Sequence, residues 1–213
     1  MSSTLPGAAT HPERHRGLEL LGPIVRLQVQ RAPLKLGEKP HRWYEPAPIT
    51  PVSALRLDAG GTTGIDGDAT IHDVHHRDHE LSRFRGENGI SVGFTSHYAL
   101  MRDRFGDHLA DGIAGENLLI ATDKTFDSAS VAEGIVIVTA DGEVPLTEVQ
   151  IAAPCVEFSR FCLRYDRDQR TDRAVSEAVA FLHQGVRGFY ATCGSEGQPV
   201  IRLGDLAFRR LPA

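Results

Sequence analysis

Hydrophobic and polar residues alternate along several short runs of the chain, as they do in strands that bury one face. The clearest run is IVRLQVQ at residues 24–30, where Val25, Leu27 and Val29 alternate with polar neighbours. It predicts an antiparallel strand with one solvated face. Similar runs, separated by turn residues, predict strands at 54–57, 90–95, 117–122, 134–140, 144–152, 188–192 and 200–210.

Helical periodicity is confined to a few segments. Residues 95–105 predict a helix that Thr95 or Ser96 caps and Gly106 ends. Residues 172–184 predict a second helix, and apolar residues at helical spacing after Pro154 predict a third. The predicted fold class is therefore mainly β with a few helices (α+β), which favours a barrel or a sandwich.

The two ends of the chain differ in character. Residues 1–22 carry proline, glycine, serine and basic residues without periodicity, and they predict a flexible N-terminal arm. Residues 31–51 contain five prolines and predict mostly loop. Since there is no internal repeat and no sign of a second core, residues 23–213 are predicted to form a single domain.

Composition and charge narrow the classes of partner. The chain has 41% hydrophobic and 24% charged residues, which is typical of a globular protein. Its net charge of −5 gives no electrostatic reason to bind nucleic acid or an anionic membrane. The sequence shows no membrane-spanning stretch and no secretory signal, so we expect a cytoplasmic protein that acts on a small-molecule substrate.

Cys155 is the cysteine with the clearest chemical potential. The chain has three cysteines, too few for a disulfide framework or a zinc ribbon. Cys162 lies on an apolar helical stripe and Cys193 at a strand end, so packing is the expected role of both. Cys155 follows Pro154 in a predicted first helical turn, where free backbone N–H groups favour a thiolate. It is a candidate nucleophile, sulfur carrier or soft-metal ligand.

A second candidate is a histidine-rich segment that follows residues 64–68. Its members are His72, His75, His76 and His79. They would share one face of a helix and could then hold a divalent metal, as in a metal-dependent hydrolase. The alternative is a solvated polar loop, which is favoured because the segment has no apolar stripe to anchor a helix.

Five motifs, taken together and in this order, resemble the MOSC domain, named for the C-terminal domain of molybdenum cofactor sulfurases. They are GIDGD at 64–68, GENLLI at 115–120, APC at 153–155, RGFYA at 187–191 and VIRLGDLA at 200–207. The likeness covers residues 24–210. A second GEN at residues 86–88 precedes a different strand and is interpreted as coincidental.

The resemblance implies a compact β-barrel-like fold whose cysteine faces a pterin-bound molybdenum or carries transferable sulfur. Cys155 matches the family's cysteine, and His72 matches its pattern more loosely. The matching turn residues are Gly67 and Asp68 in the GD turn and Gly115, Glu116 and Asn117 in the GEN turn.

The leading functional hypothesis is that Cys155 binds the molybdenum of a molybdenum-pterin cofactor as a thiolate. Arg160, Arg187 and Arg202 are the candidates to neutralise the cofactor phosphate. The reaction would be two-electron reduction of N-hydroxylated or N-oxide small molecules, with electrons from a separate electron-donor protein.

The alternative hypothesis is a sulfur carrier, a sulfurtransferase in which Cys155 holds a persulfide supplied by a cysteine desulfurase. The chain lacks an aminotransferase-like lysine domain that could mobilise sulfur, so no bound pyridoxal phosphate (PLP) is expected. Both hypotheses therefore require a protein partner.

Overall fold

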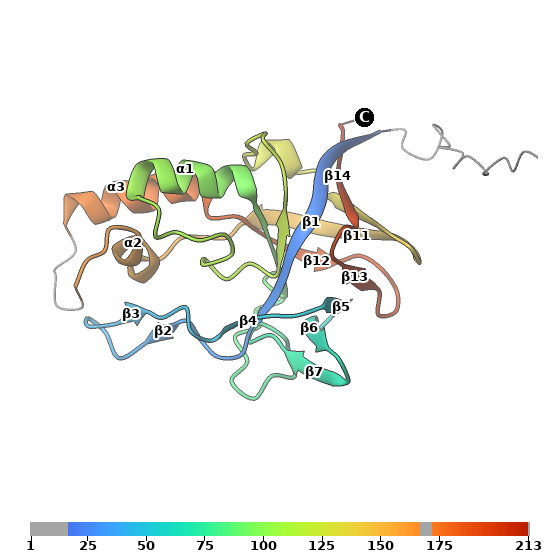
Figure 1. Cartoon of the computed structure of the whole chain (residues 1–213), viewed down its shortest axis with the longest axis horizontal. Coiled ribbons are helices and arrows are strands. Elements are labelled where there is room, and N and C mark those ends of the chain that lie inside the picture. Colours follow the sequence, from blue (N-terminus) through green and yellow to red (C-terminus); the bar gives the residue numbers. More distant parts are fainter. Residues whose placement is uncertain (1–16, 167–171, 213) are drawn as a thin grey trace, which may run out of the picture.

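The chain folds around a closed β-barrel (Figure 1), seen in a computed structural model that describes residues 17–166 and 172–212. In these residues seven strands form the closed ring, because the first and the last strand in chain order pair with each other. Their order around the barrel is β1 (Leu18–Gln30), β14 (Leu206–Arg210), β10 (Ile135–Thr139), β11 (Gly142–Ile151), β12 (Phe189–Cys193), β8 (Ile90–Phe94) and β9 (Leu118–Ile120). The predicted class, mainly β with a few helices, is confirmed.

Smaller elements cover the barrel. A second sheet joins β13 (Val200–Arg202), β5 (Ala54–Asp58), β6 (Gly61–Asp66) and β7 (Ala69–His72), while β4 (Ile49–Pro51) pairs with β1. The hairpin of β2 (Lys35–Leu36) and β3 (Trp43–Tyr44) lies beside helix α2 (Val156–Cys162). Helices α1 (Thr95–Phe105) and α3 (Arg173–Phe181) lie together with α2 at one side of the barrel (Figure 1). Short turns η2 (Ala129–Val131) and η3 (Leu182–Val186) complete the set.

The barrel interior and the helix layer each bury apolar side chains. Val92, Phe94 and Phe189 are fully buried inside the barrel. Outside it, Tyr98 of α1 and Phe158 of α2 are buried in a second cluster. Strands β8 and β9 are parallel, and α1 supplies the crossover that parallel neighbours require. No helix in the described part of the chain combines the length and apolar character needed to cross a bilayer.

The first strand differs from its prediction in start and in pattern. It begins at Leu18, so residues 18–22 of the predicted arm belong to the barrel, while residues 1–16 lie outside the described part. Leu27 and Val29 are buried as predicted, but the alternation fails at Val25, which is 46% exposed because the register shifts between Ile24 and Arg26. Beyond this irregularity, the polar residues Gln28 and Gln30 are buried.

The other predicted helices and strands are present, with local differences. Helix α1 has the predicted bounds, but Phe94 occupies its cap position and no side chain caps it, because the Thr95 hydroxyl binds the carbonyl of Thr122. Asp172 caps α3 by accepting the Val175 N–H at 3.1 Å. Residues 200–210 form two strands in different sheets, and β6 and β7 were not predicted.

Candidate functional site

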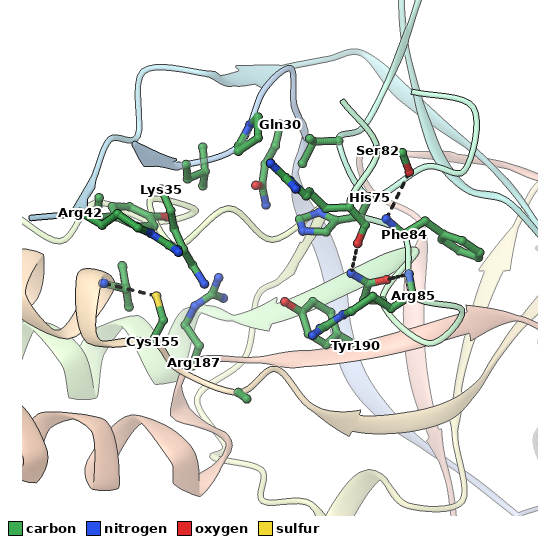
Figure 2. Close-up of a pocket in the computed structure, with 18 of the residues that line it drawn as sticks. Gln30, Lys35, Arg42, His75, Ser82, Phe84, Arg85, Cys155, Arg187 and Tyr190 are labelled. Atoms are coloured by element: carbon green, nitrogen blue, oxygen red, sulfur yellow. Dashed lines mark hydrogen bonds between the residues drawn. The ribbon is translucent and has the colours of Figure 1, made fainter. Parts of the chain in front are cut away.

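A cavity of about 660 Å³ opens between the β2–β3 hairpin, the loop after β7, and the starts of α2 and β12 (Figure 2). Cys155 lines it together with five cationic side chains, Lys35, Arg42, Arg83, Arg85 and Arg187. The lining residues that the structure describes include no aspartate or glutamate. Figure 2 shows the charged ends of Lys35, Arg42 and Arg187 converging beside the Cys155 sulfur.

Three of these cations are held by carboxylates outside the cavity lining. The ion pairs are Arg42 with Glu157 at 3.1 Å, Arg85 with Glu87 at 3.7 Å and Arg187 with Glu116 at 3.2 Å. Among the described residues, Lys35 and Arg83 have no carboxylate within ion-pair distance. The cavity wall is therefore positively charged in a chain whose net charge is −5.

Cys155 is the N-cap residue of α2, one residue before the helical turn in which it was predicted. Its backbone is extended, with φ −115° and ψ 158°, and its Sγ accepts the N–H of Phe158 at 3.4 Å. The thiol is half-buried in the cavity wall. Cys162 is buried in the helix layer, where loss of solvent raises the pKa of its thiol to about 12. The thiol available to a ligand in the cavity is that of Cys155.

Arg187 is held from several directions. Its guanidinium donates to the Ala114 carbonyl and to Glu116 Oε1, and it lies over the Phe158 ring at 5.2 Å. Burial opposes its charge, but the Glu116 carboxylate raises the pKa of Arg187 overall. Glu116 Oε2 in turn accepts the Tyr98 hydroxyl at 2.7 Å. This network presents a rigid, permanently charged fork to the cavity.

The GEN turn supports the cavity from behind its wall. Gly115 has φ +89°, and a Cβ there would come within 2.7 Å of the Gln30 side-chain nitrogen, so glycine is required. Asn117 accepts the Ser91 N–H at 2.9 Å and donates to Asp73 Oδ2 at 2.9 Å. Gly115, Glu116 and Asn117 thus position other groups, and none of them lines the cavity.

Four predicted cofactor-binding residues lie away from this cavity. Gly67 and Asp68 form the exposed tip of the β6–β7 hairpin. Arg202 is exposed beside Asp141 at 3.6 Å, because the RLGD motif forms the turn between β13 and β14. Arg160 is on the buried side of α2 and borders a separate cavity of about 430 Å³. The structure therefore does not gather these residues around Cys155.

The four histidines do not form the predicted helical face, because β7 ends at His72 and a loop follows. The rings of His72 and His76 stack with centroids 4.2 Å apart, but each ring has a different polar partner: His72 with Thr63, His75 with Asp73, His76 with Asp58 and His79 with the carbonyl of Arg31. Within the described residues no group of three or more metal-ligating side chains was found. The loop is not simply solvated either, since Asp73 and His76 are buried, and only His75 of the four lines the cavity.

Sequence reasoning missed four cations of the β2–β3 hairpin and of the loop after β7, namely Lys35, Arg42, Arg83 and Arg85. The second GEN, interpreted as coincidental, supports two of them. Asn88 Oδ1 accepts the Arg85 N–H at 2.7 Å and Asn88 Nδ2 donates to the Arg83 carbonyl at 2.9 Å. The available signal was the pair of arginines in SRFRGEN, directly before a glycine turn.

No protein-family model matches the chain, and no curated protein matches it. Among solved structures, YuaD from Bacillus subtilis is 16% identical with a TM-score of 0.50, over 89% of this chain and 100% of its own. A hypothetical protein is 11% identical with a TM-score of 0.52, over 92% and 70% of the two chains. YiiM from Escherichia coli is 14% identical with a TM-score of 0.46, over 77% and 65%.

At these identities the similarity concerns the fold alone. The closed barrel with its few helices agrees with the compact β-barrel-like fold that the resemblance of the five motifs implies. What the chain binds and does must be inferred from its own cavity.

Proposed function

We propose that this chain binds a molybdenum-pterin cofactor through Cys155 and catalyses two-electron reduction of N-hydroxylated or N-oxide small molecules. The observation that supports the proposal is the composition of the 660 Å³ cavity, which brings the one accessible helix-start thiol among five cationic side chains and no carboxylate. Such a cavity suits a ligand that has both a soft metal and an anionic group.

The residues present fit this cofactor in chemistry and in size. The cavity volume of about 660 Å³ lies within the usual range for small-molecule and cofactor sites. Cys155 would hold the metal as a soft thiolate, and Arg187, Lys35 and Arg42 would neutralise the phosphate. The bound molybdenum would supply the two-electron redox chemistry, which no side chain of this cavity offers.

The test of cofactor binding is elemental analysis of protein purified from a host that makes the cofactor. Wild-type protein should carry about one molybdenum per chain, and Cys155→Ser should carry at least tenfold less. Cys193→Ser is the matched control, because Cys193 is half-buried in β12 and does not line the cavity. Molybdenum retained in full by Cys155→Ser would overturn thiolate ligation.

The cationic wall can be tested separately from the thiol. Lys35→Gln and Arg83→Gln remove the two cations that have no carboxylate partner among the described residues, so each should lower cofactor retention. Arg202→Gln, outside the cavity, should leave retention unchanged. Equal retention in all three variants would contradict a role of the wall in holding the phosphate.

The reaction itself needs a second measurement. Loaded protein with reduced methyl viologen as the electron source should convert benzamidoxime to benzamidine. A loaded wild-type protein that leaves benzamidoxime and a panel of N-oxides unchanged would reject the proposed reaction while leaving cofactor binding intact.

The sulfur-carrier alternative uses the same thiol. Its support is that Cys155 Sγ is half-buried yet accepts a backbone N–H, a setting that also suits a persulfide. Intact mass spectrometry after incubation with a cysteine desulfurase and cysteine, without reductant, distinguishes the two. Gain of one sulfur atom on Cys155 would favour the carrier, and no gain would reject it.

A further inference from the structure

Asp73 and His75 form a connected pair at the wall of the same cavity. The Asp73 side chain has no exposed surface, and His75 Nδ1 lies 3.0 Å from its Oδ1. The carboxylate also accepts the backbone N–H of His75 at 2.8 Å, the backbone N–H of Gln30 at 2.7 Å and the amide of Asn117 at 2.9 Å. Every lone-pair direction of this buried carboxylate is thus used.

Within the described contacts, His75 is the one partner of Asp73 that can carry a positive charge. A buried carboxylate is costly unless its lone pairs are hydrogen-bonded, and the His75 ring supplies one of these hydrogen bonds. An ionised carboxylate only accepts hydrogen bonds, which assigns a hydrogen to Nδ1. The opposite nitrogen, Nε2, is therefore the atom of this ring that can exchange a proton with a ligand.

The His75 ring is placed to make that exchange. Its side chain is 19% exposed and lines the cavity, and Nε2 has no hydrogen-bond partner among the described residues. Figure 2 shows His75 across the cavity from Cys155, with Tyr190 below it. A ligand held at Cys155 would therefore have its far side toward His75.

We propose that Asp73 and His75 are the proton-delivering pair of this cavity, with His75 as the catalytic acid and Asp73 as its positioning residue. The inference rests on the proposed function. Two electrons from the electron-donor protein break the N–O bond of an N-hydroxylated substrate. The departing hydroxyl takes the Nε2 proton of His75 and leaves as water, and the nitrogen takes a second proton from solvent. His75 is then reprotonated by water.

The surroundings of His75 favour delivery of a proton toward a ligand. Besides Asp73, Tyr190 from β12 lies near the ring, with ring centroids 6.4 Å apart, and the five cations line the same cavity. The contact with Asp73 holds the ring in one orientation, with Nε2 on the opposite side. Arginine cannot take this role because it does not release a proton in proteins.

The activity test compares the variant His75→Gln with the control His183→Gln. His183 is exposed in η3, directly after α3. With reduced methyl viologen and benzamidoxime, His75→Gln should lower kcat about 100-fold or more while KM changes less than about threefold. His183→Gln should behave as wild type.

A second readout does not depend on the cofactor. NMR of histidine-labelled protein without cofactor should show the neutral His75 ring with its hydrogen on Nδ1. A hydrogen on Nε2 would overturn the pair, as would a His75→Gln kcat within threefold of wild type. Absence of turnover by loaded wild-type protein is a different result, because it rejects the proposed reaction rather than the donor.

Discussion

Loss of Arg187 is the perturbation whose consequence follows most directly from the structure. Arg187→Met keeps much of the side-chain volume but removes the cation that faces Glu116 at 3.2 Å. Glu116 is 2% exposed, and its remaining partner among the described side chains is the Tyr98 hydroxyl. The variant therefore leaves a buried carboxylate without a compensating charge.

The expected loss of stability is large for a single substitution. Removing one partner of a buried ion pair costs about 3–5 kcal/mol, because the other charge remains buried. Domains unfold with roughly 5–15 kcal/mol in total, so this is a substantial fraction. At about 2–4 °C per kcal/mol for a chain of this size, the melting temperature should fall by roughly 6–20 °C.

Urea unfolding of the wild type, Arg187→Met, Glu116→Gln and the double variant forms the assay. The double variant removes both charges, so it should be destabilised by at least about 1 kcal/mol less than the sum of the single variants. Arg173→Met, which breaks an exposed helical pair with Glu177, should leave the unfolding midpoint unchanged. If the stability losses of the two single variants simply add up in the double variant, or if Arg187→Met is as stable as the wild type, then the Arg187–Glu116 pair does not stabilise the fold as a buried charge pair.

Three further predictions concern other parts of the chain. Burial lowers the pKa of His97 from 6.5 to about 4, so the unfolded chain binds a proton at this histidine at higher pH than the folded chain does. About 3 kcal/mol of folding stability, fully present above pH 6.5, should therefore be lost as the pH falls toward 4. Urea unfolding at several pH values should show this loss, and His97→Gln should reduce it. Iodoacetamide at pH 8 should label Cys155 in the native protein and Cys162 only after unfolding, as read by peptide mass spectrometry, since burial raises the Cys162 pKa to about 12. Gly22→Ala would place a Cβ 1.8 Å from the Ala121 carbonyl oxygen, whereas the Cβ of Gly67→Ala meets nothing within 4 Å. Gly22→Ala should therefore lower the free energy of unfolding far more than Gly67→Ala does. Gly67→Ala should also retain as much molybdenum as the wild type.

Periodicity predicted the strands of the barrel where pairing is regular and failed where the backbone departs from it. The bulge at Val25 turns that side chain outward, while Leu27 and Val29 keep their predicted place in the core. Gln28 and Gln30 are also buried, because their amides donate to the carbonyls of Gly112 and Gly115 at 2.6 and 2.7 Å. These carbonyls are more than 80 residues away in the sequence. No local pattern contains that information.

The residues of the candidate site also fall into two groups, those that the sequence predicts and those whose place depends on distant contacts. Cys155 and Arg187 come from motifs next to regular elements, and the structure places both in one cavity. Lys35 comes from the β2–β3 hairpin and Arg83 from the loop after β7, and the position of both depends on how these segments dock on the barrel. Arg160 was predicted to neutralise the cofactor phosphate, but it lines the separate cavity of about 430 Å³ and not the one that contains Cys155.

If the Cys155 sulfur holds molybdenum inside the cationic cavity, the metal can be located by anomalous diffraction at the molybdenum edge from crystals of the loaded protein. We expect one strong peak within bonding distance of Cys155 Sγ, with the cofactor phosphate among Lys35, Arg42 and Arg187. A molybdenum peak elsewhere on the chain, with Cys155 free, would contradict this expectation.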